Sequence, residues 1–199
     1  MANPVPAQRA PRSRPSPLVR YISILLLVLV VVVGLAVLIA WASVNPKKLK
    51  YTIEQGSISR YNLTNNDHLN ANFHFVLRAN NPNKRISIYY DWIKVTVWYE
   101  HQKLSINDVR PFHQPRRNVT YLDLNLMAIQ EPLHGVVARD MRMEKSSGNV
   151  DLDVKIRSKI RLKVGVFKIH RHLNILCGTL TVPFSPSKEF ERVFCDVDL

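Results

Sequence analysis

The feature that most constrains this chain is an uncharged apolar run from Ile22 to Ala40. Its 19 residues would form a helix about 29 Å long, because each helical residue adds about 1.5 Å, and a bilayer's hydrocarbon core is about 30 Å thick. Tyr21 and Trp41 flank the run, where amphipathic rings prefer the boundary between membrane and water. The run therefore predicts a single transmembrane helix over residues 21–41.

Two other interpretations of the run stay open. A buried helix of a soluble protein would normally carry a polar stripe, which this run lacks. A cleaved signal peptide would have an apolar segment of only about 7 to 15 residues, although Ala40-Trp41-Ala42 does resemble a cleavage site. The length of the run favours an uncleaved signal anchor over both.

Residues 1–20 differ sharply in composition from the apolar run. They contain five Pro, four Arg and no acid, a composition that cannot form a core. We expect a disordered basic tail that attracts anionic lipid heads. The alternative is a polyproline ligand at Pro15-Ser16-Pro17, a much weaker signal.

Basic residues on the two sides of the run do not decide the orientation, because Lys47, Lys48 and Lys50 balance the Arg residues of the tail. Two glycosylation sequons, at Asn62 and Asn118, favour a lumenal or extracellular location for the residues on the C-terminal side of the helix. We therefore expect a cytoplasmic N-terminus and an extracellular domain over residues 42–199.

The chain has only two cysteines, Cys177 and Cys195, and both lie in this outer portion. One disulfide suits an oxidising compartment, and closing such a loop would contribute about 3 kcal/mol in the chain-entropy model. The other possibility is two buried free thiols.

The outer portion shows the period-two alternation of half-buried strands. The alternation slips near Asp91, as at a β-bulge. Pro132 opens a stretch with helical spacing, and Ser146-Ser147-Gly148 ends it. Many short strands with one helix predict a mostly β fold, a β-sandwich. The predicted strands are residues 69–78, 86–99, 122–128, 150–166, 173–182 and 193–197.

Charge is distributed unevenly within this portion. The whole chain has 28 Lys and Arg against 15 Asp and Glu, yet from Val154 to Lys188 there are eight Lys and Arg and no acid. Five of these cations fall on alternate positions, so an unbroken strand would place them on one face. We interpret this cationic ladder as a site for a polyanion such as de-esterified pectin or anionic lipid heads, the alternative being a solvated outer face. The ladder comprises Lys155, Arg157, Lys159, Arg161 and Lys163.

Signals for catalysis are weak. The seven His residues match no metal-binding motif, and His170-Arg171-His172 alone supplies too few ligands. The chain lacks the sequence motifs of a nucleophile elbow, a phosphate-binding loop or a zinc protease. We therefore expect no enzyme activity, no cofactor and no metal, and an extracellular location disfavours nucleic acid as a ligand.

One segment also resembles a known family. Asn81-Pro82-Asn83-Lys84-Arg85, continued to Tyr89-Tyr90-Asp91, is similar to the signature of the plant harpin-induced and non-race-specific disease resistance-like proteins, which carry a late embryogenesis abundant subgroup-2 domain. The similarity extends to Lys163-Val164-Gly165-Val166-Phe167, to the sequon at Asn118 and to the paired cysteines. The resemblance implies a fibronectin-like or immunoglobulin-like sandwich at the plasma membrane, linked to pathogen and stress responses, without enzymatic activity.

The signature can also be interpreted physically. Asx side chains and a Pro directly after a strand favour a turn, because they satisfy local backbone groups and fix φ. The functional alternative is an exposed basic and aromatic patch of Lys84, Arg85, Tyr89 and Tyr90 that binds a partner.

Three classes of function remain. The first is a membrane-anchored glycoprotein of plant defence or stress signalling that acts by interaction with protein partners. The second is a lipid-binding or membrane-bridging module that holds an acyl chain between its sheets. An enzyme comes last.

Overall fold

The computed structural model describes residues 17–44, 47–184 and 189–199, and it comprises two units, an N-terminal helix and a β domain that begins at Pro46. The helix α1 spans Pro17–Val44, so it extends beyond the predicted range at both ends. Pro17 at its first position is favourable, because the missing N–H would have no partner there. Residues 17–20, assigned to the tail from composition, are therefore helical, whereas the rest of the tail lies outside the described residues.

The helix α1 is apolar on every side. Its most apolar 18-residue stretch between Pro17 and Leu38 has a mean hydropathy of 3.1, and the helix is long and apolar enough to cross a membrane. A helix of this kind near an N-terminus serves as a membrane anchor or as a signal segment. The side chain of Trp41, expected at the membrane boundary, lies outside the described residues.

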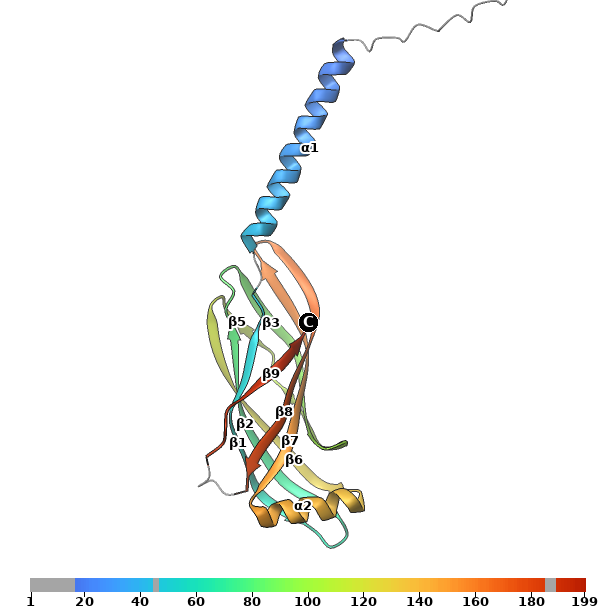
Figure 1. The fold of residues 1–199 in the computed structure, drawn as a ribbon, viewed down its shortest axis with the longest axis vertical. Coiled ribbons are helices and arrows are strands. Elements are labelled where there is room, and N and C mark those ends of the chain that lie inside the picture. Colours follow the sequence, from blue (N-terminus) through green and yellow to red (C-terminus); the bar gives the residue numbers. More distant parts are fainter. Residues whose placement is uncertain (1–16, 45–46, 185–188) are drawn as a thin grey trace, which may run out of the picture. The chain divides into compact units, whose positions relative to one another are not determined.

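The β domain contains nine strands and one helix among its described residues (Figure 1). All six predicted strands and the predicted helix are present, so the mostly β prediction is confirmed. The bulge expected at Asp91 is also present, as a register shift between Tyr90 and Trp92 against the neighbouring strand. The elements are β1 Lys50–Leu63, β2 His68–Asn81, β3 Ile86–Tyr99, β4 Gln102–Val109, β5 Phe112–Gln114, β6 Asn118–Pro132, α2 Gly135–Ser147, β7 Asn149–Val164, β8 Phe167–Pro183 and β9 Val193–Asp198.

The sheet order refines the predicted β-sandwich, because the two halves of the sheet are joined. The strands form one path, β4-β3-β7-β8-β9-β1-β2-β6, with β5 paired to β3. Strand β9 joins the halves, because its first residues pair with β1 and its last residues pair with β8. At the ends of the path, Ser105 Oγ of β4 donates to the Met127 carbonyl of β6 at 2.6 Å. The domain is therefore close to a barrel rather than an open sandwich.

Alternation of side chains places the core inside this near-barrel. On β2 every second residue is buried, including Phe73, Phe75 and Leu77. Helix α2 buries Ala138 and Met141 and ends at Gly148, whose φ of 90° suits glycine. Because His68 pairs with Pro132, which precedes α2, and Asn81 pairs with Asn118, α2 and the β2–β3 turn lie at opposite ends of the domain (Figure 1).

Candidate functional site

All five cations of the predicted ladder alternate with core residues along β7. The intervening Ile156, Ser158 and Ile160 are buried, so the cations share the outward face. Strand β7 is unbroken over this stretch and pairs with β3 on one side and β8 on the other. We call this row the basic face: Lys155, Arg157, Lys159, Arg161 and Lys163.

An acid from a neighbouring strand neutralises one member of the basic face. Arg161 donates two hydrogen bonds to the Asp91 carboxylate, from Nε at 2.7 Å and from a terminal nitrogen at 2.6 Å. These hydrogen bonds and the charge of Asp91 raise the pKa of Arg161. Asp91 closes the family signature, so the signature and the basic face meet at this ion pair, which the sequence spacing did not predict.

Aromatic rings of β3 lie among the cations, and sequence reasoning did not assign them to the site. Lys155 Nζ lies 4.7 Å from the centre of the Trp98 ring, and Arg161 Cζ lies 5.4 Å from that of Tyr89. A third cation, Lys94 of β3, lies 5.2 Å from the Trp92 ring. The sequence did contain an indication of this arrangement, because the residues of β3 that alternate with its buried residues must face outward.

The centre of the basic face is less well compensated. Arg157 and Lys159 are exposed, and within the described ranges neither forms an ion pair with an acid. Arg157 is also paired in register with Lys94 of β3. Like charges directly opposite each other in a sheet repel, so a bound anion would relieve this repulsion.

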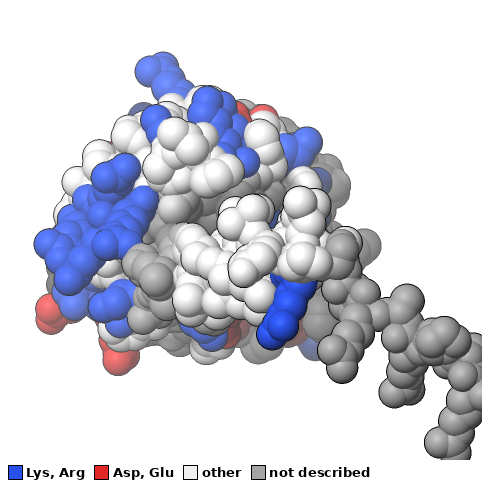
Figure 2. Space-filling model, turned by 90° about the horizontal axis from the view of Figure 1, so that it is seen from above, with Lys and Arg blue, Asp and Glu red and all other residues white. Residues whose placement is uncertain are grey.

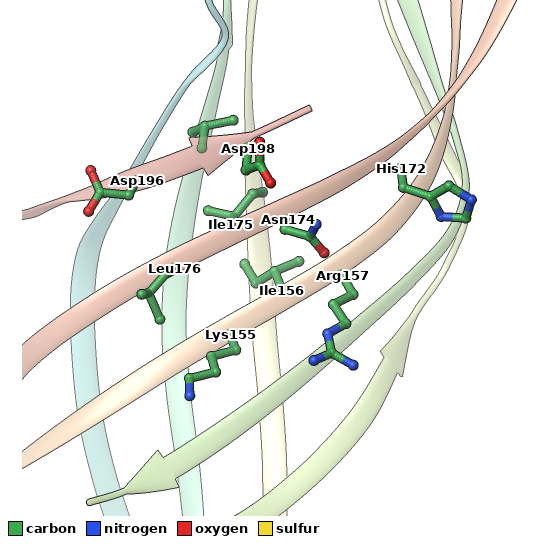
Figure 3. Close-up of a pocket in the computed structure, with 10 residues that line it drawn as sticks. Lys155, Ile156, Arg157, His172, Asn174, Ile175, Leu176, Asp196 and Asp198 are labelled. Atoms are coloured by element: carbon green, nitrogen blue, oxygen red, sulfur yellow. The ribbon is translucent and has the colours of Figure 1, made fainter. Parts of the chain in front are cut away.

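An open hollow of about 750 Å³ lies beside the N-terminal part of this row, over β7, β8 and β9. Lys155 and Arg157 line it on the β7 side, and Asp196 and Asp198 line it on the β9 side (Figure 3). The exposed side chain of Leu176 stands between them on β8. The hollow thus has a basic wall and an acidic wall, and β9 limits the basic face on this side.

The described part of the chain contains no cluster of side chains that could bind a metal ion. No three His, Cys, Asp or Glu side chains gather there in a way that could hold a metal ion. His170 and His172 are exposed on β8, in register with Arg161 and Lys159. They therefore lie beside the basic face on the β8 side.

The family signature builds a buried junction. Asn81 is fully buried, and its amide nitrogen donates to the carbonyls of Ile86 at 2.9 Å and Pro115 at 3.0 Å. Asn83 accepts from the backbone N–H of Lys47 at 2.7 Å and donates to its carbonyl at 2.9 Å. The two Asn side chains thus hold three chain segments together, the structural role that turn chemistry favoured.

The aromatic part of the signature divides between core and surface. Tyr90 is 3% exposed and shares a 2.6 Å hydrogen bond with the hydroxyl of Tyr51, while it donates to Gln114 at 3.1 Å. Tyr89 is half-buried and stacks on His113 with ring centres 4.2 Å apart. The predicted four-residue patch therefore loses Tyr90 to the core, whereas Lys84 and Arg85 are exposed.

Cys177 and Cys195 are joined in a disulfide, with Cα atoms 4.3 Å apart. Cys177 lies in β8 and is fully buried, and Cys195 lies in β9 next to Tyr51 of β1. The bond is thus placed where β9 passes from one half of the sheet to the other.

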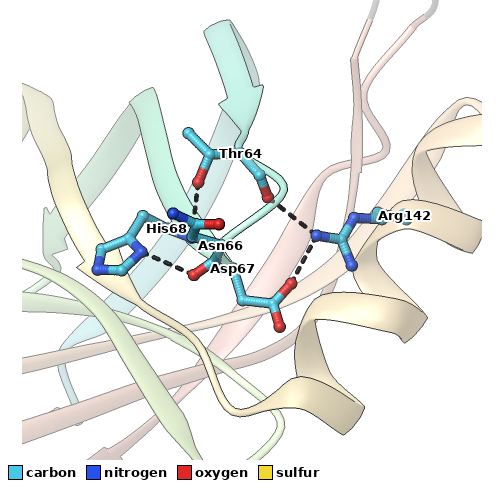
Figure 4. Close-up of polar contacts among 5 residues, drawn as sticks. All are labelled: Thr64, Asn66, Asp67, His68 and Arg142. Carbon is cyan, nitrogen blue, oxygen red and sulfur yellow. Dashed lines mark hydrogen bonds and ion pairs between the residues drawn. The ribbon is translucent and has the colours of Figure 1, made fainter.

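The two sequons lie in different settings. Asn62 is exposed near the end of β1, and the Thr64 hydroxyl of its sequon accepts from the backbone N–H of His68 at 3.1 Å. Arg142 of α2 donates to the Thr64 carbonyl and to Asp67, which fixes this turn (Figure 4). Asn118 is half-buried at the start of β6, and the Thr120 hydroxyl donates to its side-chain oxygen at 2.9 Å. The Asn62 side chain is therefore the more accessible of the two acceptors.

Comparison with known proteins gives a consistent family assignment. Residues 76–186 match the family model described as late embryogenesis abundant protein. An uncharacterized protein of Arabidopsis thaliana, At1g08160, is 32% identical over 89% of this chain and 82% of its own length. NDR1/HIN1-like protein 10 and NDR1/HIN1-like protein 3 of the same plant are each 32% identical, over 80% and 87% of this chain and 71% and 78% of their own lengths.

These matches point to plant proteins of stress and defence responses. They include the signature residues and most of the β domain, and with the relatives they reach over most of the chain. The chain therefore belongs to the late embryogenesis abundant protein family and, within it, to the NDR1/HIN1-like proteins.

Proposed function

We propose that this chain is a non-enzymatic, single-pass plasma-membrane protein of plant defence or stress responses that acts by interaction through an extracellular β domain. Helix α1 is the anchor, residues 1–20 remain cytoplasmic, and residues 42–199 are outside. The apolar surface of α1 supports the anchor. The disulfide and the two sequons support an oxidising, glycosylating compartment for the domain.

The observation that carries the proposed mode of action is the basic face on β7. Five cations share one outward face, and like charges stand opposite each other at Arg157 and Lys94. Alternate residues of a strand are about 7 Å apart, which is less than one Debye length in physiological salt. Neighbouring cations of the basic face therefore reinforce each other in attracting an extended anion. The function is therefore binding, and the ligand is an extracellular polyanion.

The aromatic rings favour an acidic polysaccharide among polyanions. Trp92 and Trp98 lie among the cations and are at least partly accessible. The apolar C–H face of a sugar ring packs on an aromatic ring, while its carboxylate pairs with a neighbouring Lys or Arg. De-esterified pectin, a polymer of uronic acids, supplies both groups in every residue.

The topology is tested on intact cells with tags at the two termini. Added protease should remove a C-terminal tag and spare an N-terminal one, and a glycosidase should shift the mobility of the parent but not of an Asn62→Gln, Asn118→Gln variant. Digestion of the N-terminal tag alone would overturn the proposed orientation.

The ligand is tested with polygalacturonate at low salt. Replacing Lys155, Lys159 and Lys163 with Gln leaves the buried residues of β7 unchanged, so the fold should persist while binding falls. A matched control removes three charges at the end of β1 and on α2, in the variant Arg60→Gln, Arg139→Gln, Lys145→Gln. Equal binding by the two variants, or no binding by the parent, would reduce the basic face to a solvated surface.

The lipid-carrier function is the alternative, and it makes a different prediction. The space between the sheet halves is filled by side chains such as Phe75, Leu124 and Leu126, which are 0–2% exposed. An acyl chain would have to displace them. Stoichiometric lipid found by mass spectrometry of the purified protein would favour the carrier over the polyanion binder.

A further inference from the structure

Four segments that are distant in sequence meet at one end of the β domain. The chain enters at Lys47, which Asn83 holds through two hydrogen bonds. The β5–β6 turn is tied to the β2–β3 turn, because the N–H of Arg117 donates to the Asn83 carbonyl at 3.0 Å. The β7–β8 turn lies beside them, since Val164 pairs with Ile86. We call this surface the basic end.

The charge of the basic end has one sign. None of the described residues 47–48, 82–85, 115–117 and 163–168 is acidic. Lys163 and Lys168 pair with each other across the β7–β8 hairpin, and Lys163 also belongs to the basic face. In the view of Figure 2, Lys and Arg gather mainly at the left and are scattered elsewhere, and the few visible Asp and Glu lie at the margins. The basic residues are Lys47, Lys48, Lys84, Arg85, Arg116, Arg117, Lys163 and Lys168.

An apolar tip stands among these charges. Strands β7 and β8 are joined by Gly165 and Val166 alone, and Gly165 has φ 58°, a conformation that favours glycine at the first position of a tight hairpin turn. Val166 is 87% exposed and Phe167 is 72% exposed. Exposing two such apolar side chains to water is unfavourable, whereas insertion into a membrane interface would bury them.

We propose that the basic end docks on anionic lipid headgroups of the membrane that holds α1, with Val166 and Phe167 inserted among the headgroups. The proposal rests on the proposed membrane anchor. Cations that surround a small apolar tip match a bilayer surface, where apolar insertion and attraction to the phosphate groups of lipids add together. Lys47 follows the last residue of α1 by only three positions, so this is the end of the domain to which the anchor is tethered.

The polysaccharide proposed for the basic face does not explain this end. A hydrated acidic polymer offers carboxylates to the cations but no apolar region for the tip. A lipid surface offers both, and it is a flat partner that several turns can touch together. Docking would leave the β3–β7–β8 face available to a ligand in the cell wall.

The test uses the full chain reconstituted in vesicles of phosphatidylcholine, with or without phosphatidylserine. A spin label is attached at Val166→Cys or, as a control at the opposite end, at Met143→Cys on α2, whose side chain is 57% exposed. All variants also carry Asn118→Gln, so that no glycan at this end hinders contact. Collisions with oxygen and with a water-soluble nickel complex report how deeply each label lies.

We expect the label at 166 to be shielded from the nickel complex in anionic vesicles, while the label at 143 stays accessible. The variant Lys84→Gln, Arg116→Gln, Lys168→Gln should reverse this shielding, with the docked-to-undocked ratio falling roughly fivefold for each charge removed at low salt. Its matched control is again Arg60→Gln, Arg139→Gln, Lys145→Gln, which should leave the shielding unchanged. Replacing Phe167 by Ser should also weaken insertion, and this second variant keeps every charge.

Three outcomes would overturn the proposal. Position 166 would be as accessible as position 143 in anionic vesicles, or its shielding would not respond to the three Gln substitutions, or it would be shielded only through contact between two copies of the chain, as spin–spin broadening would reveal. Because vesicle docking is measured after reconstitution, its failure is distinguishable from a failure of the cell-surface topology, which the protease experiment measures.

Discussion

The basic face and the basic end of the domain are both rich in Lys and Arg, but they are built in opposite ways. The basic face comes from one strand, and neighbouring strands modify it with Asp91, with aromatic rings and with the acids of β9. The basic end comes from four segments: buried Asn side chains hold three of them together, and the fourth, the β7–β8 turn, pairs beside them and carries an apolar tip. The difference shows that charge alone does not define a binding surface: its neighbours decide which kind of anion it suits.

The largest expected effect comes from the disulfide that fixes β9 beside the basic face. Replacing Cys177 and Cys195 by Ala should lower the free energy of unfolding by about 3 kcal/mol, as expected for a loop of this length in the chain-entropy model. If β9 detaches, Asp196 and Asp198 leave the hollow, and folded protein should bind polygalacturonate more tightly. Chemical denaturation and binding are measured together, and weaker binding would contradict a limiting role for β9.

The next largest effect should come from Asn81→Ala, which acts on the basic end. Loss of the Asn81 amide leaves the buried carbonyl of Ile86 and the carbonyl of Pro115 without this donor, a cost of about 2 to 3 kcal/mol. The control is Asn66→Ala in the exposed β1–β2 turn. Hydrogen exchange should increase at residues 82–85 and 115–117 in the Asn81 variant, while the centre of β7 stays protected.

A third effect is smaller and depends on pH. Burial raises the pKa of Tyr90 to about 12, and burial, followed by the charge and hydrogen bond of Tyr90, raises the pKa of Tyr51. The unfolded chain loses these protons from about pH 10, whereas the folded domain retains them, so the free energy of unfolding should fall as the pH rises from 10 toward 12.

This pair lies under the junction of the two surfaces, because Tyr90 bonds Gln114, whose amide donates to the carbonyls of Ala79 and Asn118. The loss should reach roughly 1 to 2 kcal/mol by pH 11 for Tyr90 alone. In Tyr90→Phe the decline with pH should be shallower, with Tyr121→Phe on the outside of β6 as control. An equally steep decline in Tyr90→Phe would assign the pH dependence to other groups.

The smallest expected change concerns the ion pair on the basic face. Asp91→Asn removes the negative charge beside Arg161, and stability should change by less than about 1 kcal/mol because the pair is exposed. Binding of polygalacturonate should strengthen, and docking of the basic end on vesicles should not. If Asp91→Asn strengthened both kinds of binding equally, the charge of Asp91 would act on the two surfaces together and not on the basic face alone.

Much of this fold follows from local pattern. Alternation predicted the range of β3 and the outward row of cations on β7, because side-chain direction in a strand depends only on sequence parity. It missed β1, where Gln55, Gly56 and Ser57 interrupt the apolar phase and the register shifts after Ile53. Local pattern also could not give the path of the sheet, since that depends on β9 pairing with strands from both halves.

The candidate sites divide along the same line. Asn81-Pro82-Asn83 predicted a turn, yet its contacts with Lys47 and Arg117 come from segments more than thirty positions away. The pairing of Arg161 with Asp91 depends on the β3–β7 register, which no single segment encodes. Sequence spacing therefore finds the residues of one strand and misses surfaces assembled from several.

The divided pairing of β9 has a consequence for how this domain is made. Tyr51 near the start of the domain pairs with Cys195 near its end, so the near-barrel cannot close until β9 has emerged from the ribosome. Until then β1 and β8 each have an open edge, and pairing between strands so distant in sequence is slow. Oxidation of Cys177 with Cys195 would then lock the closed near-barrel covalently. The fraction of oxidised protein would therefore measure how much of the domain has completed folding during biosynthesis.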